Sequence, residues 1–214
     1  LYLLLQEVVE RQEPLAAWLL TAHAELMTER NAAFSQPYYS PHPWVHLRRG
    51  EVKPFLKAYY NTAAALADRQ TYTFWEHFQL ISPHKVHEEG WFLMQTRWML
   101  YLEEGRTLRL MPGIPRRWLE DGQRIEIDGM ASYFGRLKVS IYSQLSQGRM
   151  TAAVEVAGGG RPLERVWLRL PHPAGRAPRR CLDGAGRALQ WDAQQEALVI
   201  EPWSGGAEIT LEYE

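Results

Sequence analysis

Residues 71–89, which read TYTFWEHFQLISPHKVHEE, combine aromatic side chains with carboxylates and imidazoles. Aromatic rings of such a segment can stack on the apolar faces of a pyranose, and its polar groups can hydrogen-bond the sugar hydroxyls. A carboxylate can also act as acid or base on a glycosidic bond. The segment therefore favours sugar recognition or cleavage, and the alternative is an ordered loop that fills a helical core and satisfies its polar groups locally. Its titratable residues are Glu76, His77, His84, Lys85, His87, Glu88 and Glu89.

A metal site is a second possible chemistry for the same segment. His84 and His87 are three residues apart, and Glu88 follows them directly. Helical zinc sites of hydrolases place their histidines four residues apart with an intervening glutamate, as in H-E-x-x-H, and that motif is absent. His42 and His46 have the right separation, but prolines break their segment and their spacing carries no weight. We therefore predict no metal and no cofactor.

The overall composition excludes several classes of protein. The chain has 214 residues, a formal net charge of -1 and 46% hydrophobic residues, which is ordinary for a globular protein. A nucleic-acid-binding protein would show a strong basic excess, and no apolar run is long enough to span a membrane. Cys181 is the single cysteine, so no internal disulfide can form. It has no histidine nearby and is expected to be a small packing residue rather than a nucleophile.

Helical patterns that could position residues 71–89 occupy the first half of the chain. A first helix is expected to end between residues 7 and 11, and a second follows Pro14. Residues 32–50 are predicted to form a long ordered loop. A third helix covers 51–68, and a fourth covers 86–104 and ends at a glycine.

The five tryptophans of the helical half divide into two groups by their position in these patterns. Trp18, Trp91 and Trp98 fall at apolar helical positions and are expected in the core. Trp44 and Trp75 fall in predicted loops, where an aromatic ring is better placed to meet a ligand.

Beyond residue 105 the apolar period changes from helical spacing to alternation. Residues 137–142 show the pattern clearly, and shorter alternating runs follow up to residue 213. Gly158-Gly159-Gly160 is expected to form a hairpin turn between two of these strands. Many short alternating strands are typical of an antiparallel β-sandwich.

Three segments, once aligned with these elements, resemble a known family. They are TFWEHF at 73–78, SPHKVHEEGWFLMQTRWMLYLEEG at 82–105 and TLRLMPGIPRRWLEDGQRIEIDGMASYFG at 107–135. Their order is similar to the C-terminal part of bacterial six-hairpin glycosidases of the α-L-rhamnosidase-like type, which have an α/α toroid followed by a β-sandwich. The resemblance implies that residues 1–107 are the C-terminal helices of an incomplete toroid and that 108–214 form the antiparallel β-sandwich.

The resemblance also implies roles for individual residues. Glu76 matches a catalytic carboxylate and is expected to be the general base that activates water. His84 matches a loop histidine that contacts substrate, although Pro83 stands where the relatives usually have Asn. Together with the aromatic residues, the expected substrate-binding set is Trp44, Trp75, His77, His84 and His87.

The general acid of such relatives comes from an earlier toroid helix, and no residue here matches it. Inverting hydrolysis needs two carboxyl groups about 6.5 to 9.5 Å apart. The chain also begins at Leu1 inside an apolar helical pattern, as a fragment would. We therefore expect a C-terminal segment of a glycoside hydrolase that is inactive alone. Its expected partners are an oligosaccharide or polysaccharide and the missing N-terminal part of the same protein, with no nucleic acid and no membrane. The source is expected to be bacterial, and the compartment, cytoplasmic or exported, stays open.

Two other interpretations remain. The chain could be a carbohydrate-binding module that uses Trp44 and Trp75, or a structural or interaction domain without a ligand. Loss of sugar binding on replacing Trp75 would favour the first, and an aromatic loop buried away from any cleft would favour the second.

Overall fold

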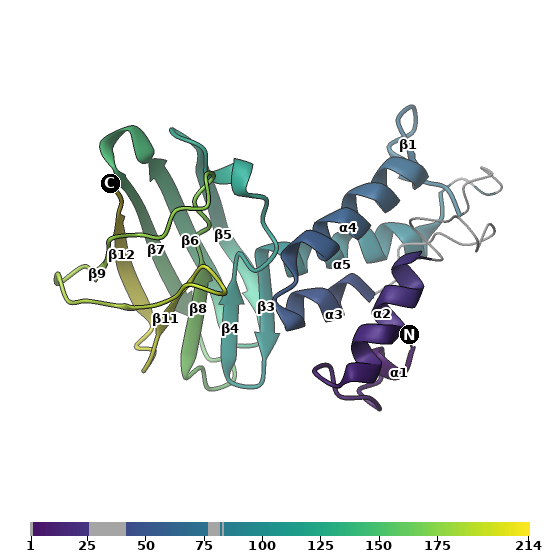
Figure 1. Ribbon diagram of the computed structural model, residues 1–214, viewed down its shortest axis with the longest axis horizontal. Coiled ribbons are helices and arrows are strands. Elements are labelled where there is room, and N and C mark those ends of the chain that lie inside the picture. Colours follow the sequence, from purple (N-terminus) through teal and green to yellow (C-terminus); the bar gives the residue numbers. More distant parts are fainter. Residues whose placement is uncertain (1, 26–41, 77–81, 83) are drawn as a thin grey trace. The chain divides into compact units, whose positions relative to one another are not determined.

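The computed structural model describes residues 2–25, 42–76, 82 and 84–214. It divides into two compact units, Leu1–Met99 and Leu100–Glu214. In the described part of the chain, the first unit contains about five helices and the second contains two mostly antiparallel sheets. The predicted order, helices first and sheets second, is therefore confirmed (Figure 1). The boundary between the units lies earlier than the predicted one after residue 107.

Five helices and one short hairpin form the described part of the helical unit. The helices are α1 (Tyr2–Leu5), α2 (Pro14–Ala24), α3 (His42–Arg49), α4 (Val52–Leu66) and α5 (Val86–Leu100). The hairpin joins β1 (Ala67–Asp68) to β2 (Thr73–Phe74), which pair in antiparallel fashion. It connects α4 to the segment that precedes α5, and so it sets where residues 75 and 76 lie.

Two apolar clusters hold these helices together. Leu20 of α2 and Val45 of α3 belong to the first cluster and are almost fully buried. The second cluster is aromatic, and in it the Phe92 ring of α5 stacks on Tyr59 of α4 at a centroid distance of 5.6 Å and packs against Phe74 of β2 at 5.0 Å. Because Phe74 is packed in this cluster, it fixes the position of the backbone that continues into Trp75 and Glu76.

Several helix boundaries differ from the predicted ones. The first helix ends at Leu5 because Glu7 adopts a positive φ of 55°, which a continuing helix cannot accommodate. Part of the predicted loop 32–50 is the helix α3, whose Pro43 occupies the first turn, where its missing N–H costs no hydrogen bond. The rest of that loop, up to residue 41, lies outside the described residues.

Trp18 was predicted to lie in the core, and this prediction was wrong. Its side chain is 72% exposed on α2, whereas Trp98 of α5 is buried. Trp91 is half-buried and packs against Trp98 at a centroid distance of 6.3 Å. An apolar residue at helical spacing marks a face that is compatible with burial, but the neighbouring elements decide whether the face is covered.

His23, near the end of α2, should make the helical unit sensitive to acid. Burial lowers the pKa of His23 from 6.5 to about 4. The unfolded chain therefore takes up this proton at a higher pH than the folded chain, so stability is present above pH 6.5 and is lost as the pH falls toward 4. Between pH 8 and pH 5, we expect this one residue to remove about 2 kcal/mol of unfolding free energy.

Urea unfolding followed by circular dichroism at 222 nm, at both pH values, measures this loss. Replacing His23→Gln removes the titrating group, so the variant should lose about 2 kcal/mol less than the wild type over the same interval. An equal loss in the two proteins would contradict the proposed cause.

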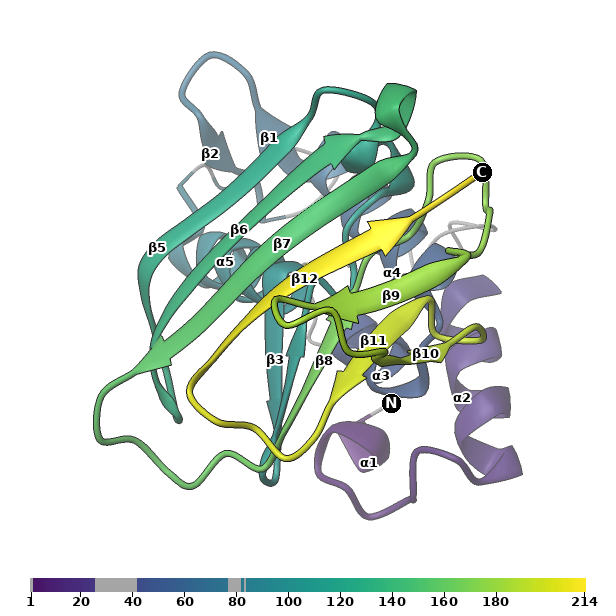
Figure 2. The same ribbon diagram turned by 90° about the vertical axis from the view of Figure 1, so that its left-hand side faces the viewer.

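The second unit, which the structure describes in full, contains two five-stranded sheets that face each other as a sandwich (Figure 2). One has the order β10-β11-β8-β4-β3 and the other β5-β6-β7-β12-β9. Every strand pair in residues 100–214 is antiparallel except β4 with β8, which is parallel. The strands are β3 (Tyr101–Glu104), β4 (Thr107–Leu110), β5 (Arg124–Ser132), β6 (Gly135–Gln144), β7 (Arg149–Ala157), β8 (Arg165–Arg169), β9 (Arg180–Asp183), β10 (Gln190–Asp192), β11 (Ala197–Ile200) and β12 (Gly206–Glu212).

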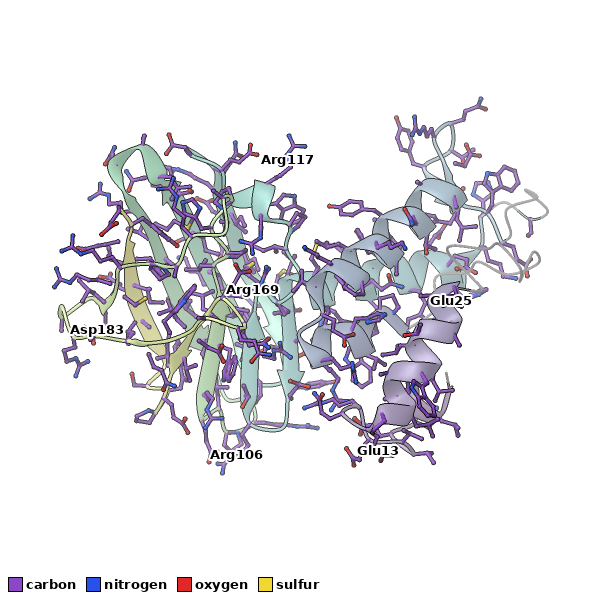
Figure 3. The ribbon with its side chains drawn as sticks, in the orientation of Figure 1. Glu13, Glu25, Arg106, Arg117, Arg169 and Asp183 are labelled. Atoms are coloured by element: carbon purple, nitrogen blue, oxygen red, sulfur yellow. The ribbon has the colours of Figure 1, made fainter. Side chains whose placement is uncertain are left out.

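The alternation that predicted the strands also builds the core of the sandwich. Leu137, Val139 and Ile141 of β6 are buried, and the residues between them face solvent. One buried cation, Arg169 of β8 (labelled in Figure 3), is accommodated because its guanidinium donates to the Ile114 carbonyl at 3.0 Å and pairs with Glu196 at 3.0 Å.

The predicted helix 86–104 is shorter than expected. It ends at Leu100, and Tyr101–Glu104 form β3, which pairs with β4 around Gly105. Gly105 has a positive φ of 59°. A glycine after an apolar run suits a helix end and a hairpin turn equally. The hairpin forms because β4 also pairs with β8, so residues 101–104 gain a place at the edge of a sheet.

The triple glycine at 158–160 was predicted to form a hairpin turn, and this prediction was wrong. It leaves β7 in one sheet and leads to β8 in the other. The chain there passes directly over the turn between β5 and β6, where Arg161 N–H donates to the Tyr133 carbonyl at 2.7 Å. Gly160 allows this close approach of two backbones.

Candidate functional site

The candidate site lies between the end of β2 and the start of α5. The Glu76 N–H donates to the Ser82 carbonyl at 3.0 Å, and the Lys85 N–H donates to the Phe74 carbonyl at 3.1 Å. These two bonds bring the two ends of the segment together. Residues 77–81 and 83 lie outside the described residues, and the predicted binding residue His77 is among them.

The side chains of Glu76 and Lys85 meet across this closure. Lys85 Nζ lies 2.6 Å from Glu76 Oε1, and the two side chains are 29% and 27% exposed. A neighbouring ammonium group stabilises a carboxylate anion. The carboxylate is therefore held in place and still reachable from solvent, as a base or a nucleophile must be.

A second carboxylate occupies the first turn of α5 under very different conditions. Glu88 is fully buried, and its Oε1 lies 3.1 Å from His87 Nε2. The positive end of the helix macrodipole favours an anion at this position. Because Glu88 has no exposed surface, it cannot contact a sugar, but it can orient the His87 ring, which is 49% exposed.

Both members of the Glu76–Lys85 ion pair affect the pKa of His87. Partial burial and the charge of Lys85 lower its pKa below the usual 6.5, while the charge of Glu76 acts in the opposite direction. His87 is therefore neutral at pH 7 and can donate or accept a hydrogen bond. The charges of Glu76 and Lys85 therefore both influence the protonation of His87.

This coupling gives a prediction with opposite signs for two substitutions. Lys85→Met removes a positive neighbour and should raise the pKa of His87, whereas Glu76→Gln removes a negative neighbour and should lower it further. The NMR titration of the His87 ring measures both shifts. Shifts in the same direction in the two variants would show that the three side chains are not arranged as described.

The remaining predicted residues lie at different places. Trp75 is half-buried next to Glu76, and its backbone N–H donates to the Leu66 carbonyl at 2.9 Å. His84 is exposed and has a positive φ of 59°. Its charge contributes to a lowered pKa of Asp68, which is due mainly to the Gln70 backbone N–H. The structure therefore brings Trp75, Glu76 and His87 into one segment of the fold.

Trp44, which we had placed in a loop, lies in α3. Its ring packs against Trp98 at a centroid distance of 6.1 Å, and the Arg48 guanidinium covers it at 4.4 Å. A hollow of about 360 Å³ lies beside it, and Glu7 and Glu10 are among the lining residues. Trp75, Glu76 and His87 are not among the residues that line this hollow.

Neither the pairing of Lys85 with Glu76 nor the burial of Glu88 was predicted from the sequence. The partner of Glu76 is nine positions away, and no helical or strand period links the two residues. The only available signal was the composition of the segment, in which a lysine stands between two histidines close to the start of a helix. The closure of the segment, rather than its periodicity, creates the pair.

The part of the chain that the structure describes contains no group of three or more His, Cys, Asp or Glu side chains placed to hold a metal ion. Among the same residues, no helix has the length and apolar character needed to cross a membrane. Comparison of the sequence with models of protein families and with curated proteins finds no match.

Proposed function

We propose that the chain is the C-terminal segment of a glycoside hydrolase that acts on a bacterial or plant oligosaccharide or polysaccharide, with Glu76 as a catalytic carboxylate. The observation that carries the proposal is the Glu76–Lys85 pair, a charged and reachable carboxylate held at 2.6 Å directly after Trp75. The resemblance of residues 73–135 to α-L-rhamnosidase-like enzymes supports the same assignment.

In this proposal Glu76 acts as the general base. It takes a proton from water as the oxygen attacks the anomeric carbon, and an acid protonates the departing glycosidic oxygen. Lys85 holds the carboxylate in its ionised form, in which it can accept the proton. Trp75 forms part of the sugar subsite, and neutral His87 hydrogen-bonds a sugar hydroxyl.

The acid must be a second carboxyl group, about 6.5 to 9.5 Å from the base if the reaction inverts the anomeric centre. Glu88 does not suit this role because it is fully buried. We assign the acid to another part of the same protein, in keeping with the resemblance, and we expect the chain alone to be inactive.

A non-catalytic carbohydrate-binding function is the second candidate. The hollow beside Trp44 favours it, because an indole ring next to the carboxylates Glu7 and Glu10 is a combination that suits a sugar. Arg48 lies over the ring, so a ligand that stacks on that face would have to displace the guanidinium.

The test is the release of reducing sugar by the natural protein that contains this chain. A panel of plant and bacterial polysaccharides, including rhamnose-containing ones, is incubated with that protein and, separately, with this chain. We expect release by the whole protein only. Binding of a polysaccharide without any release would support the carbohydrate-binding function and contradict the hydrolytic one.

A further inference from the structure

The sheet β5-β6-β7-β12-β9 is shown face-on in Figure 2. Its outer face carries a hollow of about 660 Å³. This volume is within the range of small-molecule sites in proteins. The hollow crosses from β5 to β9, and the spacing of strands makes the part between β5 and β12 roughly 14 Å long. It is a groove that runs across the strands of the sandwich.

The sequence creates this groove by placing small side chains on the middle strands. Ser140 of β6 pairs with Ala153 of β7, and in the next row Thr151 of β7 pairs with Thr210 of β12. Larger residues stand on both sides of this floor. They are Arg124, Glu126 and Tyr142 on one side and Leu182 and Glu208 on the other.

The chemistry of the groove is that of a polyhydroxylated ligand. The hydroxyl groups of Ser140, Thr151 and Thr210 can each donate and accept a hydrogen bond. Glu126 and Glu208 are acceptors for sugar hydroxyls, and within residues 100–214 neither of them forms an ion pair.

The other charged side chains around the groove have partners within the protein. Arg124 lies over the Tyr142 ring at 4.3 Å, and Glu212 pairs with Arg180 at 3.4 Å. Asp183 (labelled in Figure 3), at the end of β9, accepts hydrogen bonds from the Ala185 and Arg187 backbone. The hydroxyl groups of the floor and the carboxylates of Glu126 and Glu208 offer many hydrogen bonds to an uncharged polyhydroxylated ligand.

We propose that this groove binds a neutral oligosaccharide chain, laid across the strands, as a site separate from the Glu76 segment. The inference goes beyond the proposed hydrolytic function and does not depend on it, because a carbohydrate-binding groove on the sandwich holds a polysaccharide whether or not the helical unit cleaves one.

Affinity electrophoresis of the full 214-residue chain tests the site. Native gels contain galactomannan, arabinoxylan, mixed-linkage β-glucan or dextran, and a parallel gel contains the cationic diethylaminoethyl-dextran. We expect at least one neutral polysaccharide to retard the chain. Retardation by none of them, or by the cationic polymer alone, would overturn the proposal.

Three variants test whether the binding is in the groove. Ala153→Arg fills the floor of the groove from β7 and should weaken binding by about tenfold or more. Glu155→Arg changes the next outward residue of the same strand, outside the groove, and should leave binding unchanged. Glu208→Ala removes both acceptor oxygens without adding bulk and should weaken binding about tenfold. Equal binding by Glu208→Ala and the wild type would overturn the proposal even if Ala153→Arg fails to fold.

A fourth variant separates this site from the proposed active site. Glu76→Gln should leave the retardation of the chain unchanged, because Glu76 belongs to the other unit. If Glu76→Gln abolishes binding while Ala153→Arg does not, the sugar binds at the Glu76 segment and the groove proposal is wrong. If the groove binds sugar but the natural protein releases none, the hydrolytic proposal fails alone.

Discussion

Replacing Glu76 by Gln in the natural protein is expected to lower kcat by about 10³-fold, which corresponds to about 4 kcal/mol of transition-state stabilisation. The amide keeps the shape of the side chain but cannot take a proton from the attacking water. KM should change much less, because binding of the ground state does not require the proton transfer. Steady-state kinetics on the best substrate of the panel measure both constants.

Glu89→Gln is the matched control for this experiment. Glu89 lies in the first turn of α5, close in sequence to Lys85, and the same change of charge is made there. It should leave kcat within about twofold of the wild type. The stability of Glu76→Gln should fall by less than about 1 kcal/mol, because a partly exposed ion pair contributes little. A large loss of stability would therefore point to a structural role for Glu76.

Replacing Gly160 by Ala should destabilise the sandwich by about 3 kcal/mol. A Cβ at this position would fall on the Phe134 carbonyl group and would come within 2.6 Å of Gly135 N. These are backbone atoms of the β5–β6 turn, so no side-chain rotation can relieve the clash. For a unit of about this size, such a loss lowers Tm by roughly 10–20 °C.

Gly159→Ala is the control for the steric argument. A Cβ there meets no atom within 4 Å, so the variant should have wild-type stability or gain up to about 1 kcal/mol from a more restricted unfolded chain. Differential scanning calorimetry of both variants gives the comparison. Similar melting temperatures for the two proteins would show that the backbone of residues 158–160 does not pass over the turn as described.

The strands were predictable from the sequence because burial of one sheet face makes apolar and polar residues alternate along each strand. Leu137, Val139 and Ile141 alternate with polar residues, and their inward direction follows from that alternation alone. The end of α5 was not predictable in the same way. The signal at Gly105 fits two structures, and the choice depends on β8, a partner strand about sixty residues further along the chain.

The candidate site was predictable to a similar extent. Glu76 was selected because the resemblance matches it to a catalytic carboxylate, and in the structure its side chain is partly exposed and pairs with Lys85. Its contact with Lys85 depends on the path of the intervening segment, which no periodicity specifies. The burial of Glu88 was not predictable either, because a charged residue in the first turn of a helix is ordinarily solvated.

The central claim is that Glu76 supplies the base for hydrolysis, and chemical rescue of Glu76→Ala tests it most directly. Sodium azide is a nucleophile that needs no base, and it fits the space left by the carboxylate. On an activated aryl glycoside, the variant of the natural protein should be nearly inactive in buffer. Azide should restore turnover and give a glycosyl azide, with the nitrogen bonded to the anomeric carbon and the aryl oxide leaving. Wild-type turnover of Glu76→Ala without azide would contradict the claim.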